Sequence, residues 1–483
     1  MSTRCCIGID WGTHSSKICV ADPGEKYLVA PLLSSDLLRQ GDCLVFSPAG
    51  HSNEEDVVRR LKRDLIEHSL SIPFWGKDDR PDSGTSLGEA VVFSLTCLIA
   101  EGRRLASARG ARDFTETEVG FSFPNWLAEE TRQAAIAVTS FCQAVQAAVH
   151  IAVEERTEDL PAAGVPFPIR RLKESVAAAM GAVSDGKKRQ LTMESANQTA
   201  FRLASRGPEW RFIVESGAAG LPYLRGMKFH QRPGIAGLAK LLVVDAGAGS
   251  TDVGYMLKTS HIETGKPAFY YLPPASSFPE AGNALTGEIV KYYRAQNKPV
   301  TWTEAEAQKT SQTAWHKLPF VQLWIRHICD HVAQYVQGVP DERWLPFPVT
   351  LHLVVTGGSS LVPGLKEALQ ESVIGALRSR GFAERTCNAV DVVDRYEPRF
   401  TFRVEAEVAR RAVCFGAADP DKPGFRYTAK MDPRSTGAHG TATMGLGPRE
   451  VRLLPGGGSF RVILLRAEDR TEGRASGNPS RCR

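Results

Sequence analysis

The sequence lacks several features that would assign it to a familiar class of protein. None of its 10 cysteines forms a C-x-x-C pair, and we expect buried thiols in a reducing compartment. The longest apolar run, at positions 90–100, is too short to cross a bilayer of about 30 Å. Asp10 interrupts the apolar N-terminal run too early for a secretion signal. We therefore expect a cytoplasmic protein with no membrane partner.

The sequence also lacks an excess of charge of one sign. It has 59 basic and 54 acidic side chains, and no basic block is interleaved with aromatic residues as a single-strand binder requires. We therefore expect no nucleic-acid partner. The 483 residues, 42% hydrophobic and 23% charged, have an ordinary globular composition, and the chain is too long for one hydrophobic core. Two lobes or domains are expected.

The N-terminal segment CCIGIDWGTHSSKICVAD combines an apolar strand, an acid and a glycine turn. The acid is Asp10, the turn contains Gly12, and hydroxyl groups follow at Thr13, Ser15 and Ser16 before a second strand. A glycine turn lets backbone N–H groups approach an anion closely. A carboxylate beside the same anion can hold a hydrated Mg²⁺. The segment therefore predicts a phosphate-binding hairpin.

The same pattern recurs in the segment LLVVDAGAGSTDVGYM. An apolar strand leads to Asp245, and Gly247, Gly249 and Ser250 follow before a second acid at Asp252. This recurrence indicates an internal duplication and predicts a cleft between two lobes that each contribute one hairpin.

A third segment, LHLVVTGGSSLVPGLKEAL, reads as a strand that ends at Gly357 and Gly358. Ser359 or Ser360 is predicted to cap the following helix, whose apolar residues recur at helical spacing. Two Asp–Gly hairpins followed by a Gly–Gly turn from strand to helix are far more specific than any one of the three segments.

The three segments resemble the phosphate-1, phosphate-2 and adenosine motifs of the actin-like ATPase superfamily, most closely those of the seventy-kilodalton heat-shock chaperones. VVRRLKRDL is similar to the stretch with the family's catalytic lysine, which falls on Lys62. VGFSFPNWLAEETRQAA resembles the stretch with the proline switch and its arginine, at Pro124 and Arg132. FIVESGAAG resembles the segment with a catalytic-site glutamate, at Glu215. The resemblance covers roughly the first 420 residues.

The resemblance implies an α/β, two-lobed actin-like ATPase fold of duplicated ribonuclease-H-like domains that binds ATP or ADP with Mg²⁺ between its lobes. It implies a slow, Mg²⁺-dependent ATPase. The catalytic residues would be Lys62, Glu215, Asp245 and Asp252, and the metal would be held by Asp10 and Asp245. The nucleotide would contact Gly12, Thr13, His14, Gly247, Ala248, Gly249, Ser250, Gly357, Gly358 and Ser359.

The sequence departs from the family at three of these places. His14 stands where a threonine is usual, Ala248 replaces a glycine, and Ser216 follows Glu215 where the family has proline. Weaker family landmarks lie near Gly282 and Gly416.

The expected division is a first lobe at 1–240, a second lobe at 241–420 and a C-terminal extension at 421–483. An insert at 154–210 has no counterpart in the family and reads as a proline-rich loop followed by an alanine-rich helix. The extension is rich in Gly and Pro, contains an apolar hairpin at 451–465, and is expected to be disordered after Arg466. It is too short for the peptide-binding sandwich and helical lid of the chaperones.

We therefore expect a heat-shock-chaperone-like ATPase that couples ATP hydrolysis to lobe opening and closure and acts on protein partners through the insert or the hairpin. One alternative is an actin-like filament former that serves cell shape or segregation. Another is a small-molecule kinase, because GIDWGT also resembles the opening of the sugar kinases, which usually lack an acid placed like Asp252. The client and the oligomeric state are left open.

Overall fold

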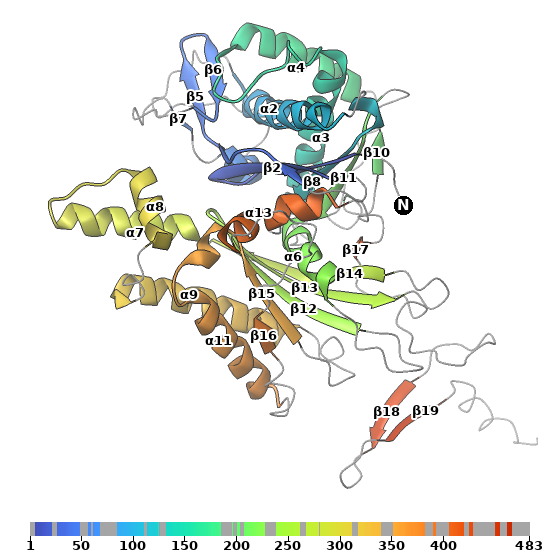
Figure 1. Ribbon diagram of the computed structural model, residues 1–483, viewed down its shortest axis with the longest axis vertical. Helices are drawn as coiled ribbons and strands as arrows, with labels where there is room; N and C mark the ends of the chain where they lie inside the picture. The colour runs from blue at the N-terminus through green and yellow to red at the C-terminus, as the bar shows by residue number, and fades with distance from the viewer. Residues whose placement is uncertain are drawn as a thin grey trace, which may run out of the picture.

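The computed structural model describes 21 parts of the chain, and these parts form a mixed α/β fold of five layers (Figure 1). From top to bottom in that view they are a group of helices, a first sheet, a central pair of helices, a second sheet and a second group of helices. The described residues are 5–21, 27–48, 57–58, 61–67, 85–110, 114–123, 125, 132–184, 196, 200–202, 207–227, 238–260, 267–279, 281–311, 317–339, 351–381, 390–392, 405–419, 425–427, 450–454 and 461–465.

The first sheet has the order β10-β11-β8-β1-β2-β3, and β4 pairs with β2. Its strands are β1 (Cys6–Asp10), β2 (Ser15–Ala21), β3 (Leu28–Val29), β4 (Leu33–Ser34), β8 (Glu118–Phe123), β10 (Ala200–Arg202) and β11 (Glu209–Val214). The predicted N-terminal hairpin is present, since β1 and β2 pair antiparallel. β1 and β11 both run parallel to β8, which makes the sheet mixed.

Helices α2 (Leu87–Ala108) and α3 (Arg132–Glu154) cover the first sheet. A capping box starts α2, because the Ser86 side chain accepts from the Glu89 N–H and the Glu89 carboxylate accepts from the Ser86 N–H. The apolar stripe of α3 is buried and consists of Ala134, Val138, Phe141, Val145 and Ala148. Within the described part of the chain, Ala134–Glu154 is the only helical stretch long and apolar enough to cross a membrane, and 61% of its most apolar window is buried inside this fold.

The predicted insert contributes two short strands and one long helix to this first half, and β10 of the first sheet is one of the two strands. The alanine-rich helix predicted there is α4 (Ile169–Ser184), which packs on α2 and α3. β9 (Phe167–Pro168) completes a small sheet of order β7-β5-β6-β9. Its other strands are β5 (Leu37–Gln40), β6 (Cys43–Phe46) and β7 (Val57–Val58), and α1 (Leu61–Glu67) packs on α2 and α3. η3 (Phe114–Glu116) precedes β8.

The second sheet has the order β16-β15-β12-β13-β14-β17. Its strands are β12 (Leu238–Ala246), β13 (Thr251–Ser260), β14 (Pro267–Phe278), β15 (Leu351–Thr356), β16 (Val390–Val392) and β17 (Phe425–Tyr427). The predicted second hairpin is present as the antiparallel pair β12–β13, and β15 runs parallel to β12. Helices α9 (Pro319–Gly338) and α11 (Leu365–Ser379) cover one face, while α7 (Gly282–Ala295) and α8 (Trp302–Ser311) project to the side (Figure 1).

Helices α6 (Glu215–Gly226) and α13 (Glu405–Ala417) form the central layer and pack extensively on each other. The buried Arg411 of α13 donates to the carbonyl of Ala30 at 2.7 Å and so ties this helix to the first half. Arg225 at the end of α6 forms a bidentate ion pair with the buried Asp419. Because each helix contacts strands of both sheets, any change in the angle between the two halves must displace this pair.

The cap predicted for the helix after the Gly–Gly turn is wrong. Residues Gly358–Leu361 form the 3₁₀ turn η6, and the N-cap of α11 is Gly364, in the left-handed conformation with φ of 86°. The Ser360 hydroxyl donates to the carbonyl of Gly357 at 2.7 Å, and that of Ser359 to the carbonyl of Gly247 at 2.9 Å. The Ser360 hydroxyl therefore bonds within the turn, and the Ser359 hydroxyl bonds to the second hairpin.

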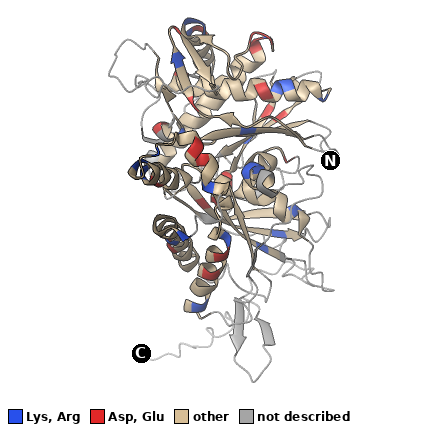
Figure 2. Cartoon of the chain, turned by 60° about the vertical axis from the view of Figure 1, so that its left-hand side comes forward, with Lys and Arg blue, Asp and Glu red and all other residues tan. Residues whose placement is uncertain are grey.

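The remaining expectations concern thiols, charge and the C-terminal extension. Of the eight described cysteines, all but Cys43 are buried. Basic and acidic residues are interspersed over both halves in Figure 2. The predicted apolar hairpin is present as β18 (Glu450–Leu454) and β19 (Arg461–Leu465), which pair antiparallel. The segment after Arg466, predicted to be disordered, lies outside the described residues.

Candidate functional site

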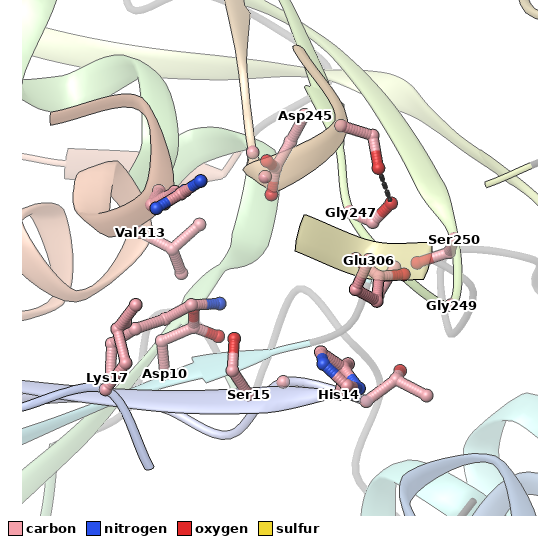
Figure 3. Close-up of a pocket in the computed structure, with 18 of the residues that line it drawn as sticks. Asp10, His14, Ser15, Lys17, Asp245, Gly247, Gly249, Ser250, Glu306 and Val413 are labelled. Atoms are coloured by element: carbon pink, nitrogen blue, oxygen red, sulfur yellow. Dashed lines mark hydrogen bonds and ion pairs between the residues drawn. The ribbon is translucent and has the colours of Figure 1, made fainter. Parts of the chain in front are cut away.

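One cleft of about 470 Å³ lies where the turns of the two hairpins meet. Its walls come from the β1–β2 turn, the β12–β13 turn, the end of β15, α8 and α13 (Figure 3). All 15 residues that the sequence assigned to catalysis, metal or nucleotide line this cleft. They are Asp10, Gly12, Thr13, His14, Lys62, Glu215, Asp245, Gly247, Ala248, Gly249, Ser250, Asp252, Gly357, Gly358 and Ser359.

The two hairpins face each other with corresponding registers. Asp10 lies opposite Lys17 in the first hairpin, and Asp245 lies opposite Asp252 in the second. The tips of the two turns are in contact, because a Cβ placed on Gly249 would collide with the side chain of Thr13. The cleft is therefore enclosed between two similar walls, one from each sheet.

Two lysines that line the cleft form ion pairs with its acidic residues. Lys62 of α1 pairs with Glu215, the first residue of α6, and both side chains are buried. Lys17 donates to Asp10 Oδ2 at 2.9 Å. The hydroxyl of Ser122, near the end of β8, lies 3.3 Å from Asp10 Oδ1 and 3.4 Å from Glu215 Oε1. The sequence assigned Lys62 and Glu215 separately and did not indicate that they pair.

Three carboxyl groups of the cleft have raised pKa values. Burial, followed by the nearby charges of Asp252, Asp10 and Glu215, raises the pKa of Asp245 well above its usual range. Burial, followed by the charge of Glu215, raises the pKa of Asp252 to about 7. Burial raises the pKa of Glu215 as well, although Lys62 opposes the shift. These three acidic groups therefore lie close together, and a bound cation would lower the pKa of each.

These groups fit a hydrated divalent cation better than a directly coordinated one. Among the described residues no group of three or more His, Cys, Asp or Glu side chains has the geometry to ligate a metal. Mg²⁺ usually keeps several of its waters and is held by one or two carboxylates together with phosphate oxygens. Both oxygens of Asp10 already accept hydrogen bonds from Lys17 and Ser122. Asp245, which belongs to the second wall, is therefore the better of the two predicted metal residues.

The far end of the cleft is formed by the Gly–Gly turn and α8. Gly357 has a φ of +87°, which favours glycine, and its N–H donates to the carbonyl of Ala409 of α13 at 2.9 Å. Lys309 donates to Glu306 at 2.9 Å, and both line the cleft. A flat ligand at this end would contact backbone on one side and this ion pair on the other.

The second turn is also attached to α7. The N–H groups of Gly282 and Asn283, at the start of α7, donate to the carbonyls of Gly247 and Ala248 at 3.0 and 2.8 Å. Gly282, a weak family landmark in the sequence, therefore lies against the second turn. Its Cβ position is filled by the side chains of Ser359 and Lys309.

Sequence reasoning missed several residues of the cleft. Lys17 and Ser122 could both have been predicted. Lys17 lies opposite Asp10 across the predicted hairpin, and Ser122 lies in the segment VGFSFPNWLAEETRQAA, which the sequence had already singled out. Glu306 and Lys309 had no such signal, because α8 carries no recognisable motif. Arg410 also lines the cleft, and the weak landmark near Gly416 on the same helix did not point to it. Pro124, predicted to act as a switch, lies outside the described residues, as does the side chain of Arg132.

No known family model matches the chain, and no curated protein matches it.

Proposed function

We propose that this chain is a Mg²⁺-dependent ATPase with the two-lobed actin-like fold, similar to the ATPase of the seventy-kilodalton heat-shock chaperones. One observation carries the proposal: three segments distant in sequence, each with its own phosphate- or adenosine-type motif, line a single cleft. The similar registers of the two hairpins and the five-layer arrangement support the duplicated fold.

The turns provide the phosphate contacts in this proposal. The first turn has Gly12 and Thr13 at its tip, and the second has Gly247, Ala248 and Gly249. Small residues allow a phosphate to approach the backbone closely, and two turns from opposite walls can hold it from two sides. Lys17 and Lys62 add positive charge at the base, where charge on a transferred phosphoryl group would develop.

The carboxyl groups would hold the metal and accept a proton from the attacking water. Bound Mg²⁺ would offset the phosphate charge and lower the pKa of the neighbouring carboxyl groups. Asp252 lines the cleft opposite Asp245 in the second hairpin and would accept a proton from the attacking water. The Ser250 hydroxyl donates to Asp252 Oδ2 at 2.8 Å and so fixes the orientation of that carboxylate. Asp245 and Glu215 would orient the water and the metal.

Two measurements test this function. The melting temperature is measured with and without millimolar Mg·ATP and Mg·ADP, and single-turnover hydrolysis is measured for wild type, Asp245→Asn and Lys62→Ala. Matched controls are Asp330→Asn and Lys291→Ala, which alter exposed residues on α9 and α7 outside the cleft. A melting temperature unmoved by either nucleotide contradicts the proposal, and wild-type rates in both cleft variants contradict the assignment of the site.

Control of protein partners in the cytoplasm completes the proposal. The insert supplies α4 on the outer layer, and the C-terminal extension supplies the β18–β19 pair, which joins neither large sheet. A two-stranded hairpin has unpaired edges that another chain can extend. We propose that partners bind at the insert or this hairpin and that the ATPase controls them through lobe opening and closure.

A further inference from the structure

A buried polar cluster lies directly behind the cleft and is not part of its lining. It consists of Asn125, Ser216 and Tyr271, and all three side chains are fully buried. Asn125 Nδ2 donates to Ser216 Oγ at 2.8 Å, and Ser216 Oγ and the Tyr271 hydroxyl lie 2.8 Å apart. Longer contacts of 3.4 and 3.5 Å join Asn125 Nδ2 to the carbonyls of Val253 and Ser276. Buried polar groups of this kind are costly unless they are fully paired.

Asn125 supplies the cap that α6 lacks. The N-cap residue of α6 is Val214, whose side chain cannot accept a hydrogen bond. The Ser216 N–H in the first turn instead donates to Asn125 Oδ1 at 3.2 Å. The first turn of this helix carries Glu215, so Asn125 fixes the backbone that positions this carboxylate. Proline, the family residue at Ser216, has no N–H and could not make this bond.

An irregularity in the pairing of β13 and β14 lets Tyr271 reach this cluster. The register of β13 and β14 is interrupted between Val253 and Tyr255. A Cβ on the intervening Gly254 would lie 2.6 Å from Ser216 Oγ and would also collide with the Tyr271 ring and hydroxyl. Only glycine therefore leaves room for the hydroxyl pair, which is a second observation independent of the hydrogen bonds.

Two members of the cluster, and Val253 whose carbonyl contacts Asn125, are next to groups of the cleft. Ser216 follows Glu215, Val253 follows Asp252, and Asn125 follows β8, where Ser122 contacts Asp10 and Glu215. We propose that Asn125, Ser216 and Tyr271 form a positioning network that sets the Glu215 turn relative to both sheets and so aligns the cleft for hydrolysis. This inference rests on the proposed ATPase function. These are positioning residues, because they act through Glu215 and Asp252.

The test compares two hydroxyl deletions on the same strand. Tyr271→Phe removes the hydroxyl of the network, and Tyr270→Phe removes one from the neighbouring residue, whose side chain packs in the core on the opposite face of the sheet. We expect Tyr271→Phe to lower kcat for Mg·ATP hydrolysis about tenfold, to change KM by less than about twofold and to shift the pH–rate profile. Tyr270→Phe should leave all three unchanged. Ser216→Ala should reproduce the loss in kcat.

A double variant separates a network from independent effects. Asn125→Ala combined with Tyr271→Phe should lower kcat no further than the stronger single variant, because residues that act as a unit are not additive. If Asn125→Ala fails to fold, Ser216→Ala replaces it in the cycle. Equal kcat and equal pH profiles in Tyr271→Phe and Tyr270→Phe overturn the network, even if Tyr271→Phe is less stable. A wild-type protein without Mg·ATP turnover overturns the proposed function and this inference together.

Discussion

Replacement of Asp252 by Asn should stabilise the protein and inactivate it. Burial, then the charge of Glu215, raises the pKa of Asp252 from 3.8 to about 7 in the fold. Between these values the native state binds more protons than the unfolded state, so stability falls as pH rises through this range. At about 1.36 kcal/mol per pKa unit, the ionised carboxylate costs about 4 kcal/mol above pH 7. Asn cannot ionise and avoids this cost.

The assay is urea unfolding without nucleotide at about pH 5 and pH 8, in wild type and in Asp252→Asn. The variant should be more stable at pH 8 by up to about 4 kcal/mol, and the difference should shrink as pH falls toward 4. Asp330→Asn on the exposed face of α9 is the matched control and should show no such dependence. The same variant should hydrolyse ATP about a hundredfold more slowly. A stability difference that is equal at both pH values would refute this reasoning.

Three further predictions follow from the cleft and the extension. Mg·ATP at about one hundred times its dissociation constant should stabilise the fold by roughly 2.7 kcal/mol, as chemical unfolding with and without ligand would measure. Asp245→Asn and Lys62→Ala should retain nucleotide binding and slow single-turnover hydrolysis about a hundredfold, while Lys291→Ala should not. Extended apolar peptides should not bind residues 421–483 with micromolar affinity, because the described part of this segment contains only the short strands β17, β18 and β19, which bury little apolar surface. Fluorescence anisotropy in the ATP and ADP states checks this, and micromolar binding that weakens with ATP would restore the full chaperone interpretation.

Much of the cleft was predictable because its motifs are local. An apolar strand, an acid and a glycine turn are neighbours in sequence. Asp10, Asp245 and their turns could therefore be assigned from the sequence alone, without the knowledge that they line one cleft. Glu306 contributes from a polar helix with no motif, and only the tertiary fold brings it to the cleft. The cap predicted at Ser359 was wrong because the hydroxyl instead satisfies the carbonyl of Gly247, a partner 112 residues away. Sequence periodicity cannot reveal such long-range pairing.

The paired registers of the two hairpins have a consequence for the direction in which a ligand lies. The position opposite the first-strand aspartate is Lys17 in one wall and Asp252 in the other. The two walls thus have corresponding registers and differ in charge, because only the first wall places a lysine opposite its aspartate, and this difference gives the cleft an electric polarity across its width. A ligand that carries both anionic groups and a bound cation has one favourable orientation, with its anions toward Lys17 and its cation toward Asp245 and Asp252. Exchange of the charges at these two positions should reverse that preference.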